Sequence, residues 1–350
     1  MAQNKLTAID LFAGAGGSTE GLKRAGFKVL GAVENNKWAI QTYKANHPSV
    51  KLWQDDILQV SPADMRTDLG LQTGELTLLL ACPPCQSWST LGSGDPDDPR
   101  NDLIEAVWPF VREFEPRCVI LENVPGLSHD RRFRRFVRRL REQGYGVRPL
   151  IVNAIDFGVP QNRRRLVTLA VRGMSGRKLP GCLPMESGKS RPKPSRVVFS
   201  RIERLRESGV ADEIDVSRNL KDETVARVSA IPVGGSRSDL PEALQLECHK
   251  KLETGASSPY GRIRLSEPGP TMTTRCTSPS CGRFVHPTEH RGLTLREAAL
   301  FQTFPPNYEF KGTYGAIEAQ IGNAVPVLMA KQLGRATLTI LDPDFIACRA

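Results

Sequence analysis

The 350-residue chain carries 48 Lys and Arg against 38 Asp and Glu, so its formal net charge is +10 and its pI is near 9.3. Its length allows a sizeable core and about two domains, so we do not expect a mini-protein held together by disulfides. No apolar run approaches the roughly 20 residues that cross a bilayer, so we expect a soluble protein. Eight irregularly spaced cysteines and a start without signal-peptide order predict free thiols in a reducing, cytoplasmic compartment, while the positive charge favours a polyanionic partner.

Strand-like apolar runs alternate with helical patterns from Leu6 to about Val171. The strand-like runs are LTAIDLF, KVLGAVE, LTLLLA, CVILENV and RLVTLAV, and the helical patterns include STEGLKRAGF and NDLIEAVWPFVREF. This alternation predicts βαβ units and therefore an α/β fold with a doubly wound, mostly parallel sheet. Ligands bind beyond the carboxyl ends of the strands in such sheets, and polar clusters follow several of these runs.

The first strand runs into a glycine-rich loop, DLFAGAGGSTEGL. Gly14, Gly16 and Gly17 allow a tight turn and the close approach of a ligand to a helix N-terminus. A dinucleotide fingerprint would need a glycine where Thr19 stands, so the dehydrogenase pattern fails. The form F-x-G-x-G-G resembles the loop that holds the methionine end of S-adenosylmethionine in methyltransferases, and a simple structural turn is the alternative.

Two further strand ends carry acids. Glu34 stands twenty residues after Gly14, where a carboxylate can accept hydrogen bonds from both ribose hydroxyls. In QDDI, Asp56 and Ile57 are placed to contact the amino edge and the face of an adenine ring. Either acid could instead cap a helix. Three such strand ends in order predict a nucleoside site.

The segment TLLLACPPCQSWST places two cysteines around a pair of prolines at the end of a strand. A redox dithiol would also follow a strand, and a zinc site would need a second pair of ligands. The candidates for that pair are Cys248, His249, Cys276 and Cys281, whose spacing matches no common zinc pattern. We therefore expect no metal and interpret Cys85 as a nucleophile, with Cys82 in or near the strand end.

The segment RRFRRFVRRLR, at Arg131–Arg141, carries an apolar stripe. Phe133, Phe136, Val137 and Leu140 follow the spacing i, i+3, i+4, i+7. The stripe predicts an amphipathic helix that covers the sheet with its arginines on the wet face. Direct contact of these arginines with a nucleic acid is the alternative.

The alternation is lost between about Arg172 and Arg262. Pro, Gly, Ser and scattered basic residues dominate GMSGRKLPGCLPMESGKSRPKPSR and IPVGGSRSDLPEA. This composition predicts a second, smaller, loop-rich domain, with boundaries 1–180, 181–290 and 291–350, the last part completing the first domain. After this domain, LTLREAALFQTF predicts a helix, and EAQIGNAVPVLMAKQLGRATLTIL predicts a loop that enters another helix and packs back on the first domain.

Six segments stand in order along nearly the whole chain. They are DLFAGAGGSTEGL, PPCQS, ENV at Glu122–Val124, QNRRR at Gln161–Arg165, RGLTLREAALFQTFP at Arg291–Pro305 and QIGNAVP at Gln320–Pro326. Together they resemble the motif set of the DNA (cytosine-5) methyltransferases, of the bacterial type with unpermuted order. The resemblance implies a Rossmann-like, S-adenosylmethionine-dependent catalytic domain, and it makes the loop-rich insertion a target-recognition domain.

The resemblance also implies the chemistry. Cys85 would add as a thiolate to carbon 6 of a flipped-out cytosine, so that carbon 5 can accept a methyl group from S-adenosylmethionine, leaving S-adenosylhomocysteine. Glu122 would donate a proton at ring nitrogen 3. Arg163 and Arg165, which point to one side if QNRRR is extended, would hold the carbonyl oxygen of the base and nearby phosphates and favour the thiolate.

Contacts to cofactor and DNA follow from the same resemblance. The implied cofactor contacts are Phe12, Ala13, Gly14, Gly16, Gly17, Glu34, Asn35, Asp56, Ile57, Pro84, Leu103, Asn323 and Val325. The implied DNA contacts are Gln86, Ser87, Ser89 and Arg237. Asn35 departs from the family, which commonly places a large apolar residue there against the adenine. In GGSRSDLP, Arg237 could bind guanine in a bidentate manner, or instead contact a phosphate or water.

The polar, glycine-rich segment Gln86–Arg100 is expected to close over the flipped nucleotide, with an ordinary surface loop as the alternative. We expect a monomeric, sequence-specific methyltransferase of double-stranded DNA, with a cognate restriction or other defence system as a candidate companion. A tRNA cytosine methyltransferase and a non-catalytic DNA-binding relative are the competing hypotheses. The long insertion favours DNA over tRNA, and the intact set Cys85, Glu122, Arg163 and Arg165 argues against a non-catalytic relative.

Overall fold

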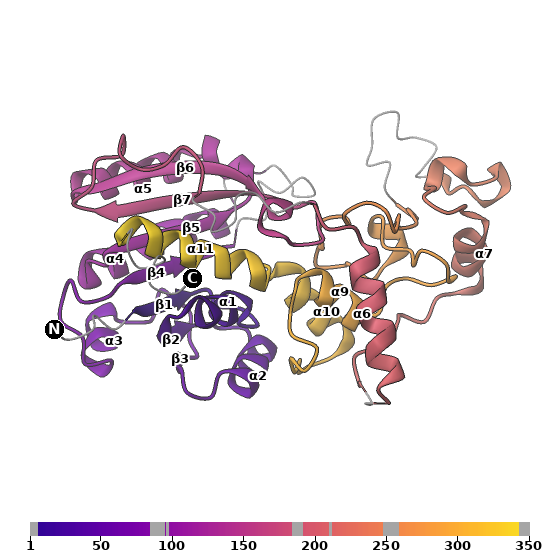
Figure 1. Cartoon of the computed structure of the whole chain (residues 1–350), viewed down its shortest axis with the longest axis horizontal. Helices are drawn as coiled ribbons and strands as arrows, with labels where there is room; N and C mark the ends of the chain where they lie inside the picture. Colours follow the sequence, from indigo (N-terminus) through magenta and orange to yellow (C-terminus); the bar gives the residue numbers. More distant parts are fainter. Residues whose placement is uncertain are drawn as a thin grey trace. The chain divides into compact units, whose positions relative to one another are not determined.

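The computed structural model describes residues 6–84, 95, 98–183, 192–209, 212–247 and 259–342. The chain divides into two compact units (Figure 1). Unit 1 comprises Met1–Asn153, Arg164–Lys189 and Val327–Ala350, and unit 2 comprises Ala154–Arg163 and Ser190–Pro326. This division rests on compactness, so the functional boundaries after residues 180 and 290 stay a prediction.

Unit 1 contains a seven-stranded sheet. Its strands are β1 (Thr7–Leu11), β2 (Lys28–Val33), β3 (Lys51–Trp53), β4 (Leu78–Ala81), β5 (Cys118–Asn123), β6 (Tyr145–Asn153) and β7 (Arg164–Arg172). Their order is β3-β2-β1-β4-β5-β7-β6, and β7 runs in the direction opposite to that of the six other strands. The expected mostly parallel α/β sheet is confirmed. The five apolar runs coincide with β1, β2, β4, β5 and β7, whereas β6 was not predicted because its outer half alternates between partly buried and exposed residues at the edge of the sheet.

Helices cover this sheet. They are α1 (Gly17–Ala25), α2 (Lys37–Asn46), α3 (Pro62–Asp68), the 3-10 helix η1 (Pro99–Val107), α4 (Trp108–Phe114), the 3-10 helix η2 (Pro125–His129), α5 (Arg131–Glu142) and α11 (Val327–Leu341). The core includes Leu11, Leu79, Phe110, Leu121 and Phe136, all nearly inaccessible to solvent. None of the described helices combines the length and the apolar character that crossing a membrane requires.

The last helix, α11, packs against α1 (Figure 1). A Cβ at Gly21 would lie 2.5 Å from Ala330 Cβ, and one at Gly334 would lie 2.8 Å from Ala25 Cβ. Real Cβ atoms do not approach so closely, so the two glycines permit the contact between these helices. The expected return of the final helix to the first domain is confirmed.

Unit 2 has no strand among its described residues. Its helices are η3 (Ala154–Phe157), α6 (Arg196–Glu207), α7 (Asp222–Ala230), η4 (Arg237–Asp239), η5 (Glu242–Leu244), η6 (Pro279–Cys281), α9 (Leu295–Phe301) and α10 (Tyr314–Asn323). A small apolar cluster contains Val228, Ile231, Leu240, Tyr260 and Val285.

One prediction for this unit is confirmed and one is wrong. LTLREAALFQTF forms α9, whose Thr294 and Glu297 build a capping box. EAQIGN was expected to be a loop, yet it forms the second half of α10. The start signal lies upstream, where the Thr313 side chain accepts a hydrogen bond from Ala316 N, and Ile317 and Ile321 bury one face.

Candidate active site

The loop between β1 and α1 has an unusual backbone. Phe12 has a φ of 61°, Gly14 of 55° and Gly16 of 87°. A left-handed φ costs a residue with a side chain about 1–3 kcal/mol, so Phe12 marks a locally strained segment of the kind found at ligand sites. A Cβ at Gly14 would meet nothing within 4 Å, so glycine serves there for its conformation rather than for lack of space.

The carboxylate of Glu34 is tied to this loop. It follows β2 and accepts hydrogen bonds from the backbone N–H groups of Gly14 at 2.7 Å, Asn36 at 2.8 Å and Asn35 at 3.1 Å. Burial raises the pKa of Glu34, and the three amide donors oppose that rise. The carboxylate is therefore held in a fixed orientation beside the predicted nucleoside site.

The ends of β2 and β3 bring two further predicted residues together. Asn35 Nδ2 lies 3.5 Å from Asp56 Oδ2, while Asp56 Oδ1 accepts a hydrogen bond from Leu58 N at 2.9 Å. Ile57 is buried next to them. Asp56 thus stabilises its own turn, which is not a helix, and lies beside Asn35.

A buried acid below the glycine loop was missed by sequence reasoning. Asp10 Oδ2 accepts hydrogen bonds from the hydroxyls of Ser18 at 2.6 Å and Thr19 at 2.7 Å, and the Thr19 hydroxyl lies 2.8 Å from that of Tyr43. Asp10 Oδ1 is buried with no hydrogen-bond partner among the described residues. Burial raises the pKa of Asp10 to about 6. A lone acid inside the apolar run TAIDL was the available signal.

Glu122 and Arg165 form an ion pair between two neighbouring strands of the sheet. Glu122 lies on β5 and Arg165 on the neighbouring antiparallel strand β7, and Arg165 Nε lies 3.0 Å from Glu122 Oε1. Their side chains are only 8% and 13% exposed. Burial lowers the pKa of Arg165, and the charge of Glu122 opposes that shift. Two predicted catalytic side chains are thereby placed in contact.

The segment that leads to the predicted nucleophile is fixed by the last residue of β5. Asn123 Nδ2 donates a hydrogen bond to Pro83 O at 2.8 Å. Burial raises the pKa of Cys82, and the charges of Glu122 and Asp10 add to the shift, so this thiol stays neutral near pH 7. Pro84 is exposed. The predicted residues Cys85, Gln86, Ser87 and Ser89 lie outside the described residues, and Leu103 packs from η1 against the core.

The QNRRR segment shows the expected alternation of burial. Arg163 and Arg165 are mostly buried, whereas Arg164 between them is exposed. In unit 2, Arg163 Nη1 donates hydrogen bonds to Met272 O at 2.8 Å and Gly322 O at 3.3 Å, so Arg163 holds two backbone segments together.

Other predicted residues of unit 2 lie at the end of α10 and beyond it. Asn323 is exposed and Val325 is buried. Each of these positions is described here within unit 2 alone, and their contact with a cofactor stays a prediction.

The GGSRSDLP segment is held by arginine side chains that sequence reasoning missed. Arg283 Nη1 donates to Gly234 O and Gly235 O, both at 3.0 Å, and to Arg262 O at 2.9 Å. Arg264 Nε adds a longer bond of 3.3 Å to Gly234 O. Ser236 and Asp239 close a capping box at η4. Arg237 therefore stands on a segment whose backbone is fixed from several sides.

Arg262 holds together backbone segments close to GGSRSDLP. It is buried, and its guanidinium donates to Val228 O at 2.8 Å, Ile231 O at 3.1 Å and His286 O at 2.7 Å. An arginine in a loop-rich sequence gives no signal for such a role, because its partners are carbonyls far along the chain.

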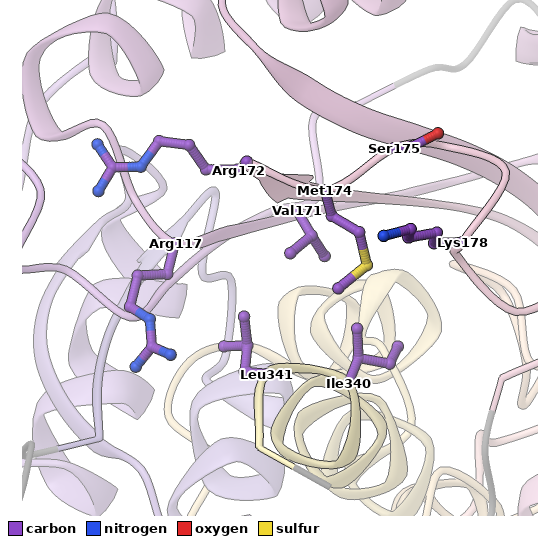
Figure 2. Close-up of a pocket in the computed structure, with 9 residues that line it drawn as sticks. Arg117, Val171, Arg172, Met174, Ser175, Lys178, Ile340 and Leu341 are labelled. Carbon is purple, nitrogen blue, oxygen red and sulfur yellow. The ribbon is translucent and has the colours of Figure 1, made fainter.

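A cavity of about 410 Å³ lies elsewhere in unit 1 (Figure 2). Ile340 and Leu341 of α11 lie opposite Val171 and Met174 in it, and Arg117 lines it just before β5 begins. Since Glu122 is near the other end of β5, this cavity is at the edge of the sheet opposite the predicted site. It contains none of the predicted site residues. Within the described ranges, no group of three or more His, Cys, Asp and Glu could hold a metal ion, and the candidate zinc ligands Cys248 and His249 lie outside those ranges.

Comparisons with known proteins give a consistent result. Residues 6–339 match the family described as C-5 cytosine-specific DNA methylase. Over 348 residues the chain is 32% identical to the Type II methylase M.HgiDII of Herpetosiphon aurantiacus, and the match covers 95% of each chain. It is 34% identical over 345 residues to the Type II methyltransferase M.PspPI of Psychrobacter sp., covering 95% of this chain and 79% of that relative.

Two solved structures share the fold. A DNA modification methyltransferase encoded within a prophage (E. coli) matches with a TM-score of 0.69 and 22% identity, covering 96% of this chain and 99% of that one. The Dnmt2 methyltransferase of S. pombe matches with a TM-score of 0.65 and 18% identity, covering 96% and 99%.

Proposed function

The chain belongs to the C-5 cytosine-specific DNA methylase family, and we propose that it methylates cytosine in duplex DNA with the side chains at the carboxyl edge of its sheet. The observation that carries this assignment of roles is the buried Glu122–Arg165 pair. It lies beside Asn123, whose side chain holds Pro83, two residues before Cys85. An acid and a cation thus lie in contact at one edge of the sheet, and Asn123 holds the chain two residues before Cys85, which lies outside the described residues.

The proposed reaction begins at Cys85. Its thiolate forms a bond to carbon 6 of the cytosine, and the ring electrons move to nitrogen 3, where Glu122 supplies a proton. Arg165 stabilises the carboxylate that remains on Glu122. After carbon 5 has taken the methyl group, its proton leaves to a base, the bond to Cys85 breaks and Glu122 takes back the proton from nitrogen 3, which restores the aromatic ring as 5-methylcytosine. The base must leave the duplex for these steps, because its faces are stacked.

The family depends on S-adenosylmethionine in general, and the described residues fit that group. When bound, it supplies an electrophilic methyl group. Glu34 presents a carboxylate that three backbone amides hold in place, which suits the ribose hydroxyls. The Asn35–Asp56 pair offers a polar edge for the adenine amino group.

The remaining cofactor contacts are part of the same proposal. They are Phe12, Ala13, Gly14, Gly16, Gly17, Ile57, Pro84, Leu103, Asn323 and Val325. The left-handed backbone of the glycine loop supports the first five, because it lets the chain approach a ligand closely.

Recognition of the DNA sequence is part of the proposal and is assigned to unit 2. Arg237 stands on the braced GGSRSDLP segment, and a bidentate bond from an arginine to guanine gives about 1–3 kcal/mol of discrimination. Gln86, Ser87 and Ser89 are proposed to contact the DNA near the flipped base. Two relatives are named as Type II enzymes, which supports a role beside a cognate restriction enzyme.

Covalent trapping tests the proposal. The wild-type chain should form a stable adduct with duplex DNA that contains 5-fluorocytosine, because the fluorine cannot leave as a proton does. Cys85→Ser should form none, whereas Cys82→Ala should retain it. Methyl incorporation into tRNA but not into duplex DNA would support the tRNA hypothesis instead. An adduct with Cys85→Ser would assign the nucleophile elsewhere.

A further inference from the structure

Helix α5 carries seven arginines on twelve residues. Its buried stripe, Phe133, Phe136, Val137 and Leu140, confirms the predicted amphipathic packing and fixes which arginines face the protein. The seven arginines fall into two groups with different surroundings, and only one group is neutralised.

The inner group pairs with acids. Arg132 contacts Asp102 at 2.5 Å and the helix N-cap Asp130 at 3.3 Å. Arg139 and Arg135 share Glu105, at 2.5 Å and 3.4 Å. These three arginines attach α5 to η1, and the acids compensate their charges; Arg132 is buried, whereas the Arg135 side chain is 47% exposed.

The outer group is exposed. It consists of Arg131, Arg134, Arg138 and Arg141. The acid paired with it is Glu142, 3.7 Å from Arg138, and both side chains are about two thirds exposed. Arg134 donates one bond to His129 O at 3.2 Å. In the part of the chain that the structure describes, Arg131 and Arg141 have no ion pair. A surface ion pair is worth little, so the outer face keeps most of its positive charge.

The four outer arginines form a line along the helix. The intervals of three, four and three residues place the four arginines on one side of the helix, and ten residues at 1.5 Å each span about 15 Å. A single DNA strand carries one phosphate per about 3.4 Å of duplex axis, so about four phosphates fit this length. Helix α5 follows β5 and η2, so the line begins at Arg131, nine residues after Glu122.

We propose that the outer arginines of α5, namely Arg131, Arg134, Arg138 and Arg141, form a docking surface for the phosphate backbone of DNA beyond the target site. The inference rests on the proposed function, because duplex DNA is the polyanion that this enzyme must hold. Flexible, exposed arginines contact phosphates without reading bases, so the surface raises affinity for any duplex long enough to reach it. It leaves the chemistry at Glu122 and Cys85 unchanged.

The test compares how the DNA affinity of the wild type and of a quadruple variant depends on the salt concentration. The outer four are changed together to glutamine, and the affinity for a 60-base-pair duplex without a target site is measured between 50 and 200 mM salt. Each lost phosphate contact lowers the slope of log K against log salt by about 0.9, so a decrease of about 3 to 4 is expected. A matched control changes four exposed cations elsewhere in unit 1, Lys23, Arg24, Arg112 and Arg177, to glutamine and should leave the slope nearly unchanged.

Further measurements separate this inference from the proposed function. The quadruple variant should keep its adduct with 5-fluorocytosine in a short duplex, its sequence preference and its kcat at saturating DNA. Changing the same four arginines to lysine should restore the slope, which a misfolded helix would not explain. An unchanged slope, an equal decrease in the control, or a larger effect on duplex RNA than on DNA would overturn the inference. Loss of the adduct in the wild type would instead defeat the proposed function.

Discussion

The carboxyl edge of the sheet in unit 1 and the GGSRSDLP segment in unit 2 are held by different interactions. In unit 1, the hydrogen bonds between strands fix the backbone, and Glu34 and Glu122 take their positions from the strands that end there. In unit 2, no strand occurs among the described residues, and the guanidinium groups of Arg262 and Arg283 satisfy carbonyls that a sheet would otherwise pair.

In unit 1 the strands, and not the proposed reacting side chains, hold the backbone in place. In unit 2 arginine side chains hold it. A substitution at the sheet edge can remove a reacting group while the strands keep the backbone in place. A substitution of one arginine in unit 2 leaves several buried or partly buried carbonyls without a donor, each at a cost of about 1–3 kcal/mol. Five variants test this contrast, from the largest expected effect to the smallest.

Glu122→Gln changes the acid while keeping its shape. If Glu122 supplies the proton at nitrogen 3, kcat should fall by about 10²–10⁴-fold. The affinity for S-adenosylmethionine and the urea midpoint should change little, because β5 and β7 hold the backbone. Rapid single-turnover methylation and calorimetry measure the two quantities. A parallel loss of rate and stability would mean that the Glu122–Arg165 pair is mainly structural.

Asp10→Asn tests the buried acid under the glycine loop. Its pKa in the folded protein is about 6, which is above its ordinary value, so the folded state binds the proton more tightly. The corresponding stability is present below about pH 4 and is lost as the pH rises through 6, by up to about 3 kcal/mol. The free energy of unfolding should be measured in urea at pH 4.5 and 7.5 for both proteins. The difference between Asp10→Asn and the wild type should favour the variant more at pH 7.5 than at pH 4.5. An equal difference at both values would contradict the shift.

Glu34→Ala removes the carboxylate that three amides hold. Its affinity for S-adenosylmethionine should decrease by about 1–3 kcal/mol, the range for lost hydrogen bonds to a charged group. Calorimetry of the cofactor measures the loss, and Glu20→Ala, on the neighbouring helix α1, serves as a control with the same charge change. Unchanged affinity in Glu34→Ala would remove this residue from the nucleoside site.

Arg283→Gln should loosen the segment that carries Arg237. Three carbonyls each lose one hydrogen bond, and we expect preference for the cognate sequence to fall by about tenfold, which corresponds to about 1.4 kcal/mol. Methylation of a randomised duplex library measures the preference. Arg264→Gln, which removes a longer bond to Gly234, is the matched control with a smaller expected change.

A companion variant, Arg237→Ala, separates two contacts. If Arg237 reads a base, one position of the recognised sequence should relax. A uniform decrease at an unchanged sequence, with a salt slope lower by about one unit, would assign Arg237 to a phosphate instead.

Much of unit 1 could be predicted because its signals are local. Buried strands such as LTLLLA are continuous apolar runs, and the stripe of α5 gives the helical period directly. Glu34 and Asp56 follow strand ends, and topology brings strand ends to one edge. The role of Asp10 was missed because its partners, Ser18 and Thr19, lie in the next element, and their hydroxyls gave no sequence signal of their own.

Unit 2 could be predicted only in outline. The contacts of Arg262 with Val228 O and His286 O span 34 and 24 residues, and no local pattern encodes such pairs. The loop expected at EAQIGN was wrong for a related reason. The residues Gly322 and Asn323 favour a turn, yet the buried contacts of Ile317 and Ile321 extend α10 through Asn323.

The close packing of α1 against α11 at Gly21 and Gly334 also sets an order in time. Helix α1 leaves the ribosome early, but its partner is made only after the whole of unit 2, about 300 residues later. At about 5–20 residues per second, α1 waits on the order of 15–60 s for α11. Until then its small-residue face lacks the surface that covers it. A nascent chain therefore completes unit 1 only after the whole of unit 2 has been synthesised.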